Sequence, residues 1–459
     1  MRVCLLLLAL PLAAEPLWLE EVLGSVERHY PPLLAALAER DIADADLVAA
    51  LGKFDFSLGV RADTDQFGFY PNERFAVVAE QPTQLWGGSF YGGWRLGRGR
   101  YPSYEGKQQT NSEGQYFGGF KLPLFRDREI DEKRADLRKA HIGRRIADLS
   151  IDQQRLLILQ LAARRYWDWL AAGQRFNIAR DVLRIAVERD QALKDAVELG
   201  QIARVEVTDN LRAILQRRSQ LVEAERGGQL ASIELSLFYR DDSGKPRLAT
   251  VAQLPPAMPS TSPLAEERYR ADLEQALRRR PEIGRLSELK EQALIEIKLY
   301  ENQRLPEIDL GLGFTSEAGE GNVRRGPSDL KASLTFDLPF QRRVASGKLA
   351  ASQAKFRQLQ QREAFARDQV AAEVADAASA VRAAHERVLL ITEEIAVARE
   401  LEQAERDRFR LGDSTLFLVN LREQATVDAA VREVAAHAEY FRALAQYELA
   451  TAMRLTPVH

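Results

Sequence analysis

Residues 305–314 read LPEIDLGLGF, and from Ile308 onward every second side chain is apolar. The same alternation returns at residues 330–338, after a stretch that carries glycine and serine. Successive side chains of a β-strand point to opposite faces, so a period of two indicates a strand with one apolar face. The sequence therefore predicts a β-hairpin with two strands of about nine residues.

The sequence of this hairpin region is repeated, with changes, in the first half of the chain. Residues 51–58 read LGKFDFSL and resemble residues 305–312 at an offset of 254 positions. Three further pairs recur in the same order, namely residues 30–33 with 280–283, 120–124 with 336–340, and 198–200 with 410–412. The ordered set predicts two tandem copies, residues 15–240 and 264–459, joined by a proline-rich linker over 241–263.

The first copy carries an insertion between its two predicted strands, which lie around residues 54–63 and 113–122. Residues 84–104 within it are dense in glycine, tryptophan and tyrosine. Aromatic residues of this kind are typical of a belt at a membrane surface, and a glycine-rich loop packed on itself is the alternative. We favour the belt, because predicted strands flank the insertion, and we expect four strands per chain.

Long helices are expected to fill the rest of each copy. Residues 126–199 contain no proline and two glycines, and residues 341–411 contain no proline and one glycine. A helix of roughly 70 residues extends about 105 Å. Apolar residues recur at alternating steps of four and three at Val370, Val374, Ala377, Val381, Ala384, Val388, Ile391 and Ile395. Such a heptad seam predicts a long antiparallel pair of coiled-coil helices in each copy.

The first residues are typical of a secretory signal peptide. Arg2 precedes an apolar run over residues 3–10, and small residues follow as far as Ala14. We expect cleavage near Ala14 and assign residues 1–14 to the signal peptide, with a buried N-terminal helix as the alternative. The only cysteine, Cys4, excludes an internal disulfide framework, and a net charge of −3 gives no reason to expect nucleic acid as a partner.

We find no residue pattern that is typical of an enzyme. The five histidines have no metal-ligand spacing, and they are His29, His141, His385, His437 and His459. His385 precedes a glutamate but lacks the second histidine of a zinc protease motif, and no phosphate-binding glycine loop precedes a helix. The sequence therefore predicts no catalytic residue, no metal site and no cofactor.

The predicted strands have the length of a tilted strand that crosses a bilayer. Sheet edges cannot face lipid, so spanning strands must close into a barrel. Four strands per chain fall short of the eight found in the smallest common barrels, so closure has to be intermolecular. The long helices are too polar for lipid and would continue the assembly as a tube in water.

Over residues 17–455 the chain resembles the TolC-like outer membrane efflux proteins, the outer membrane factors. The resemblance rests on RPEI at residues 280–283, on LPEIDL at 305–310, on the Leu-Pro strand ends at Pro123 and Pro339, and on RFRLGDS at 408–414. It implies a mainly α fold with membrane β, in which two tandem repeats each join a β-hairpin to long antiparallel coiled-coil helices. It also implies a homotrimer with a 12-stranded β-barrel that continues as an α-helical barrel.

The resemblance further implies a passive duct in the cell outer membrane, in contact with its lipid and with a periplasmic extension. A periplasmic adaptor (membrane fusion) protein and an inner-membrane pump would open it for efflux or secretion. Two alternatives stay open, a periplasmic adaptor and a structural coiled-coil envelope protein. An adaptor normally has one helical hairpin rather than two copies, and a scaffold would explain the heptad seam but not the paired β-hairpins.

The two helix turns are the best-defined candidate functional positions in the sequence. A long helix that reverses needs a left-handed residue at its end, which glycine supplies without strain. The resemblance implies that such turns form the periplasmic tip where the adaptor docks. The predicted docking residues are Leu199, Gly200, Gln201, Leu411, Gly412, Asp413 and Ser414. The alternative is a turn with no further role.

A tunnel constriction is expected just after these turns. Members of the family often carry acidic residues six and nine places after the turn glycine, and three copies would form carboxylate rings. The first copy has Glu206 and Asp209 at these positions, whereas the second has Leu418 and Leu421. We therefore predict a mixed constriction with one acidic and one apolar layer, and ordinary heptad packing of all four residues is the alternative.

Overall fold

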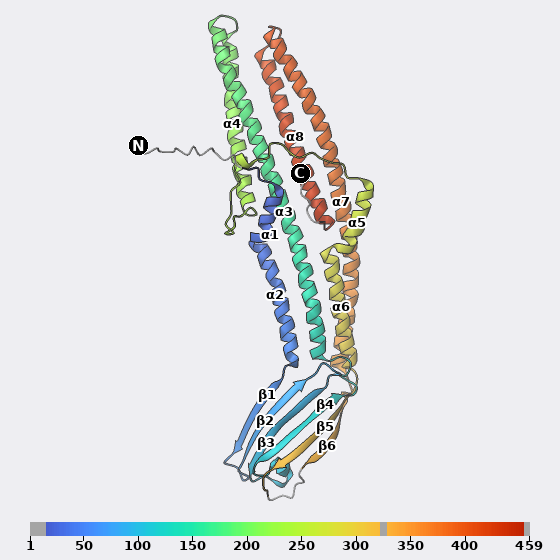
Figure 1. Cartoon of the computed structure of the whole chain (residues 1–459). Coiled ribbons are helices and arrows are strands. Elements are labelled where there is room, and N and C mark those ends of the chain that lie inside the picture. The colour runs from blue at the N-terminus through green and yellow to red at the C-terminus, as the bar shows by residue number, and fades with distance from the viewer. Residues whose placement is uncertain (1–14, 322–327, 454–459) are drawn as a thin grey trace, which may run out of the picture. The chain divides into compact units, whose positions relative to one another are not determined.

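The computed structural model describes residues 15–321 and 328–453 (Figure 1). The predicted signal peptide, residues 1–14, lies outside the described residues. The chain divides into two compact units: one holds Met1–Leu37, Ile151–Ile283 and Ala366–His459, and the other holds Ala38–Ser150 and Gly284–Phe365. Each unit combines segments from both predicted copies.

Eight α-helices occur among the described residues, and they include the predicted long ones. Their bounds are α1 Leu19–His29, α2 Pro31–Leu51, α3 Glu132–Glu198, α4 Arg204–Ser236, α5 Glu266–Arg279, α6 Pro281–Asn302, α7 Arg343–Arg410 and α8 Leu416–Ala450. α3 has 67 residues and α7 has 68, which confirms the two long helices. None of these helices is both long and apolar enough to cross a membrane.

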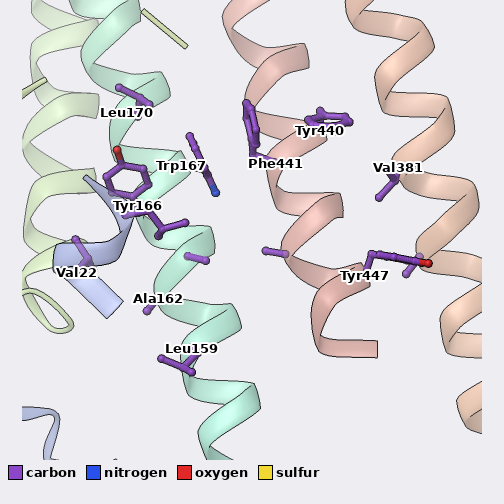
Figure 2. Packing of buried hydrophobic residues seen from close by; sticks show 14 of the residues in the cluster. Val22, Leu159, Ala162, Tyr166, Trp167, Leu170, Val381, Tyr440, Phe441 and Tyr447 are labelled. Carbon is purple, nitrogen blue, oxygen red and sulfur yellow. The ribbon is translucent and has the colours of Figure 1, made fainter. Parts of the chain in front are cut away.

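The first unit is built around one apolar core shared by α1, α3, α4, α5, α7 and α8, to which α2 adds Leu33 and α6 adds Ile283. All eight residues of the predicted heptad seam, from Val370 to Ile395, are buried, and the first seven belong to this core. Figure 2 shows the aromatic centre of this core, where Trp167 of α3 stacks on Phe441 of α8 with ring centroids 4.2 Å apart. The hydroxyl of the buried Tyr447 donates to the carboxylate of Asp272 at 2.8 Å, so this polar group is satisfied inside the core.

The second unit carries one antiparallel sheet. Its strands are β1 Ser57–Asp65, β2 Asn72–Pro82, β3 Ser89–Gly99, β4 Gly114–Pro123, β5 Glu307–Ala318 and β6 Asp329–Asp337. They lie side by side in the order β1 to β6, which Figure 1 shows as a curved layer. β1, β4, β5 and β6 correspond to the four predicted strands.

The structure corrects the predicted number of strands from four to six. β2 and β3 come from the region between the first two predicted strands, where we expected a belt or a loop. The glycines of β3 have a packing reason: a Cβ built at Gly93 would lie 2.9 Å from the ring of Phe117 on β4. The prediction of 12 barrel strands rested on four strands per chain, and the six strands observed here change that premise.

Candidate functional site

Both helix turns adopt the predicted left-handed conformation. Gly200 has φ +73° and Gly412 has φ +81°. The Gly200 N–H donates to the carbonyl of Val197 at 3.0 Å, and the next N–H, of Gln201, donates to that of Ala196 at 2.9 Å. Two bonds of this kind form a Schellman motif, which satisfies the free carbonyls at a helix end.

The second turn repeats this motif. The Gly412 N–H donates to Phe409 at 3.0 Å and the Asp413 N–H donates to Arg408 at 2.9 Å. The Arg408 side chain in turn donates to the carbonyl of Asp413, and Ser414 donates to Glu405. The turns are therefore matched in backbone geometry, and side-chain bonds add to the second.

An exposed leucine precedes each turn glycine. Leu199 is 73% exposed and Leu411 is 84% exposed. A small apolar cluster lies beside the turns and is formed by Leu193, Leu416 and Val419, with Ile202, Val207 and Phe409 around them. Because this cluster draws on α3, α4, α7 and α8, it holds the two helical hairpins together near their ends.

The residues of the predicted constriction lie on two helices, Glu206 and Asp209 on α4 and Leu418 and Leu421 on α8. Asp209 of α4 accepts a hydrogen bond from the side chain of Asn420 on α8 at 3.1 Å, so it links the two hairpins. Glu206 is half-buried one turn earlier on α4. Leu418 and Leu421 lie on the exposed face of α8, with exposed fractions of 37% and 53%.

Sequence reasoning missed a buried ionic contact between the hairpins. The carboxylate of Glu423 on α8 is buried and binds arginines from the three other helices. Arg217 of α4 lies 2.8 Å away and is equally buried, Arg406 of α7 lies 3.0 Å away, and Arg189 of α3 completes the set. We call these four residues the Glu423 cluster.

The charge on Glu423 is stable at neutral pH. Burial alone would raise the pKa of this carboxyl, but hydrogen bonds and positive charge from Arg189 and Arg217 outweigh burial and hold the pKa below its ordinary value. The sequence did carry a signal for this site. Leu416, Val419 and Glu423 follow each other at steps of three and four, so a charge occupies a heptad position where an apolar residue is expected.

The sheet separates apolar and polar side chains onto its two faces. The strand register places one set of mostly apolar residues on a single face, which we call the apolar face, and it includes Leu58, Val60, Phe75, Val77, Phe90, Trp94, Leu96, Phe120, Leu310, Leu312, Phe314, Leu330, Leu334 and Phe336. The opposite, polar face carries Arg61, Asp63, Arg74, Glu80, Arg95, Gln115, Lys121, Asp309, Glu317, Lys331, Ser333 and Asp337.

The apolar face is exposed in the single chain. Leu58, Leu330 and Leu334 are each more than 60% exposed, and β1 and β6 are exposed along their whole length. Each of these outer strands also has one edge with no strand beside it among the described residues. A soluble monomer rarely exposes so large an apolar surface, so this face and these edges need a partner or lipid.

Exposed aromatic residues lie at both ends of the sheet. Phe67 and Phe69 are almost fully exposed in the turn between β1 and β2. Trp86 is 63% exposed in the turn between β2 and β3, at the opposite end of β2. The described residues hold no group of three or more histidine, cysteine or acidic side chains that could bind a metal ion.

Solved structures with a similar fold were found over nearly the whole chain. The outer-membrane channel OprN matches with a TM-score of 0.67 and 15% identity, covering 95% of this chain and 90% of that one. The chain has the fold of the TolC-like outer membrane channels. Two further channels of this TolC-like fold are the Vibrio cholerae outer membrane protein VceC, at a TM-score of 0.65 and 15% identity, and the Neisseria gonorrhoeae outer membrane channel MtrE in its open state, at 0.66 and 16%.

These TolC-like matches extend over both helical hairpins and the sheet. VceC is matched over 95% of this chain and 96% of its own, and MtrE over 95% and 89%. Neither a family model nor a curated protein matches the sequence. The likeness confirms the predicted TolC-like fold.

Proposed function

We propose that the chain is the outer-membrane channel of a tripartite export system. Three copies form a passive exit duct in the cell outer membrane, with a helical extension in the periplasm. A periplasmic adaptor protein and an inner-membrane pump open it, and the chain itself carries no enzymatic activity. The observation that carries this proposal is the sheet, which has one apolar face and, within the described part of the chain, no strand beside β1 or β6 at its outer edges.

Closure of the sheet follows from its two edges. β1 and β6 run in opposite directions, so β6 of one copy can pair with β1 of the next as a regular antiparallel ladder. Three copies of six strands give 18 strands, and barrels of 16–18 strands enclose an aqueous channel. The apolar face then meets lipid, the polar face lines the lumen, and the exposed aromatics at both ends of the sheet form the membrane belts.

The assembly predicts a defined mass. Protein extracted from membranes in detergent is expected to be a trimer of roughly 150 kDa, three times the 51.7 kDa chain. Native mass spectrometry measures this mass directly. A stable monomer that remains in the aqueous fraction without detergent would exclude the channel.

The two helix turns are the proposed docking sites for the adaptor. The exposed Leu199 and Leu411 supply apolar contact, and Gly200 and Gly412 hold the tight reversal that presents them. A Cβ built on either glycine has no other heavy atom within 4 Å, so a side chain there would not clash with a neighbour. It would instead strain the backbone, because both residues have a positive φ.

Replacing Gly412 by valine is therefore expected to cost about 1–2 kcal/mol at the left-handed position and to weaken adaptor binding. Gly347 is a matched control, because it also has open space around it but lies inside α7 without a positive φ. The two variants are tested by measuring export in a strain that lacks the native gene, with both variants present at the same protein level. Equal export by Gly412→Val and Gly347→Val would contradict the docking role.

The exposed leucines after the second turn are proposed to close the tunnel. Three copies of Leu418 and Leu421 would form an apolar layer that resists wetting, and Glu206 and Asp209 would form an acidic layer that favours cations. Changing both leucines to serine is expected to raise the resting conductance in planar bilayers. Glu206→Gln with Asp209→Asn is expected to leave the pore closed but to weaken cation preference; an open pore from the acid pair alone would contradict this arrangement.

A further inference from the structure

We propose that the connection between β3 and β4, residues 100–113, is a constriction inside the barrel that limits the size of the molecules that leave the channel. This inference rests on the proposed function, because it takes the polar face of the sheet as the lumen wall. The connection contains a short 3-10 helix over Ser103–Gln108. It is far longer than the two to five residues of most β-hairpin loops, and long loops are usually functional.

The connection crosses the polar face instead of leaving the end of the sheet. Gly97 of β3 faces this side, because it pairs with Arg74 of β2. A Cβ built at Gly97 would come within 2.0 Å of the carbonyl oxygen of Gln108. The backbone of Gln108 therefore lies directly against the polar face, at a place where only glycine leaves enough room.

Hydrogen bonds hold the connection in this position. The Arg74 side chain donates to the amide oxygen of Gln108. The Thr110 N–H donates to the carbonyl of Gly97 at 3.1 Å, and the Thr110 hydroxyl accepts from the Gly97 N–H at 3.1 Å. The Asn111 N–H donates to the carboxylate of Glu317 at 3.0 Å. The anchors lie on β2, β3 and β5, so the connection reaches across β4 as well.

The positions of these hydrogen-bond partners indicate how the connection would restrict passage. Arg74 and Glu317 both belong to the polar face, so the segment occupies space on the lumen side of the wall. The added strands β2 and β3 widen the proposed barrel, and three inward connections narrow it again. The limit on size then lies within the barrel, and it acts independently of the helix turns.

Access of thiol reagents to the lumen tests this constriction. Ser333 lies on the polar face of β6, level with Ser89 at the start of β3, whereas Gly97 lies near the end of β3. Cys4, the only cysteine, belongs to the predicted signal peptide, so Ser333→Cys supplies the single thiol of the processed chain. Intact cells are treated with a small charged maleimide or with a maleimide on a polyethylene glycol chain of several kilodaltons.

The two reagents are expected to differ. The small reagent should label Ser333→Cys, and the large one should not. When residues 101–112 are replaced by Gly-Gly-Ser, the large reagent should label this cysteine as well. Gly97→Val in the Ser333→Cys chain should also admit the large reagent, because its side chain displaces Gln108, and this single change keeps the test valid if the shortened chain does not assemble.

Two controls separate failure of the inference from failure of the proposed function. Gly59→Val adds the same side chain to the polar face where the nearest atom to a built Cβ is 3.9 Å away, and it should behave as the parent chain. Leu334→Cys on the apolar face should react with neither reagent. Labelling of Ser333→Cys by the large reagent without any change to the connection would overturn the inference alone. Labelling of Leu334→Cys but not of Ser333→Cys would overturn the proposed function itself.

Discussion

Replacing Glu423 by glutamine is expected to loosen the ends of the two helical hairpins from each other, at a cost of about 3–5 kcal/mol. The change keeps the size of the side chain but removes the negative charge that three arginines share. Arg217 is only 4% exposed and would be left buried without a counter-ion. A buried ion pair adds little to stability over an apolar pair, but loss of one partner is costly because the other charge remains.

A second ion pair on α8 provides the matched control. Glu439 binds Arg387 of α7 at 2.6 Å, and both side chains are about half exposed. Exposed pairs contribute about 0–1 kcal/mol, so Glu439→Gln is expected to have little effect. Hydrogen exchange of residues 186–217 and 402–423 measures the opening of the hairpin ends. Faster exchange is expected for Glu423→Gln only, and equal exchange in both variants would show that the Glu423 cluster does not hold the hairpins together.

The pH dependence of the parent chain has a definite sign. The pKa of Glu423 is lowered in the folded chain, so its stabilising effect is complete above the ordinary glutamate pKa of about 4.3 and is lost as the pH falls through the lower, folded value. Between neutral pH and about pH 5, the Glu423 carboxyl should therefore have no effect on hydrogen exchange at the hairpin ends. Loosening by protonation of Glu423 is expected only in stronger acid.

Features that depend on neighbouring residues could be predicted from the sequence. The long helices follow from the absence of proline and from the heptad seam, and the turns follow from Gly200 and Gly412 at the ends of helical patterns. Each of these is decided within a few residues of the chain. The structure confirms the seam from Val370 to Ile395 and the left-handed conformation at both glycines.

Features that depend on distant residues were missed. β3 escaped prediction because glycines at 92, 93 and 97 are typical of loops, and the reason for these glycines lies in the neighbouring backbone and side chains of Val77, Phe117 and Gln108 elsewhere in the chain. The Glu423 cluster likewise could not be predicted, because its ion pairs depend on which helices lie side by side. The heptad pattern also does not say which face of α8 is covered, although the structure buries Leu416 and Val419 and exposes Leu418 and Leu421.

Leu334→Arg is expected to abolish assembly in the membrane, whereas Ser333→Arg is expected to be tolerated. The two residues are neighbours on β6, both are exposed in the single chain, and they lie on opposite faces of the sheet. If the apolar face meets lipid, an arginine near the middle of the bilayer destabilises each copy by about 2–4 kcal/mol, and this destabilisation occurs in all three copies of the trimer. An arginine on the polar face enters a water-filled lumen.

This pair separates a membrane barrel from any soluble protein with the same chain fold. Leu334 is 68% exposed, and in water a charge at so exposed a position changes stability by no more than about 0.5 kcal/mol. Assembled protein in the outer-membrane fraction, compared with total protein in the cell, measures the effect. The membrane barrel predicts that Leu334→Arg alone is lost from this fraction. If both variants assemble equally, the apolar face does not meet lipid, and its exposed leucines must instead be covered by another protein.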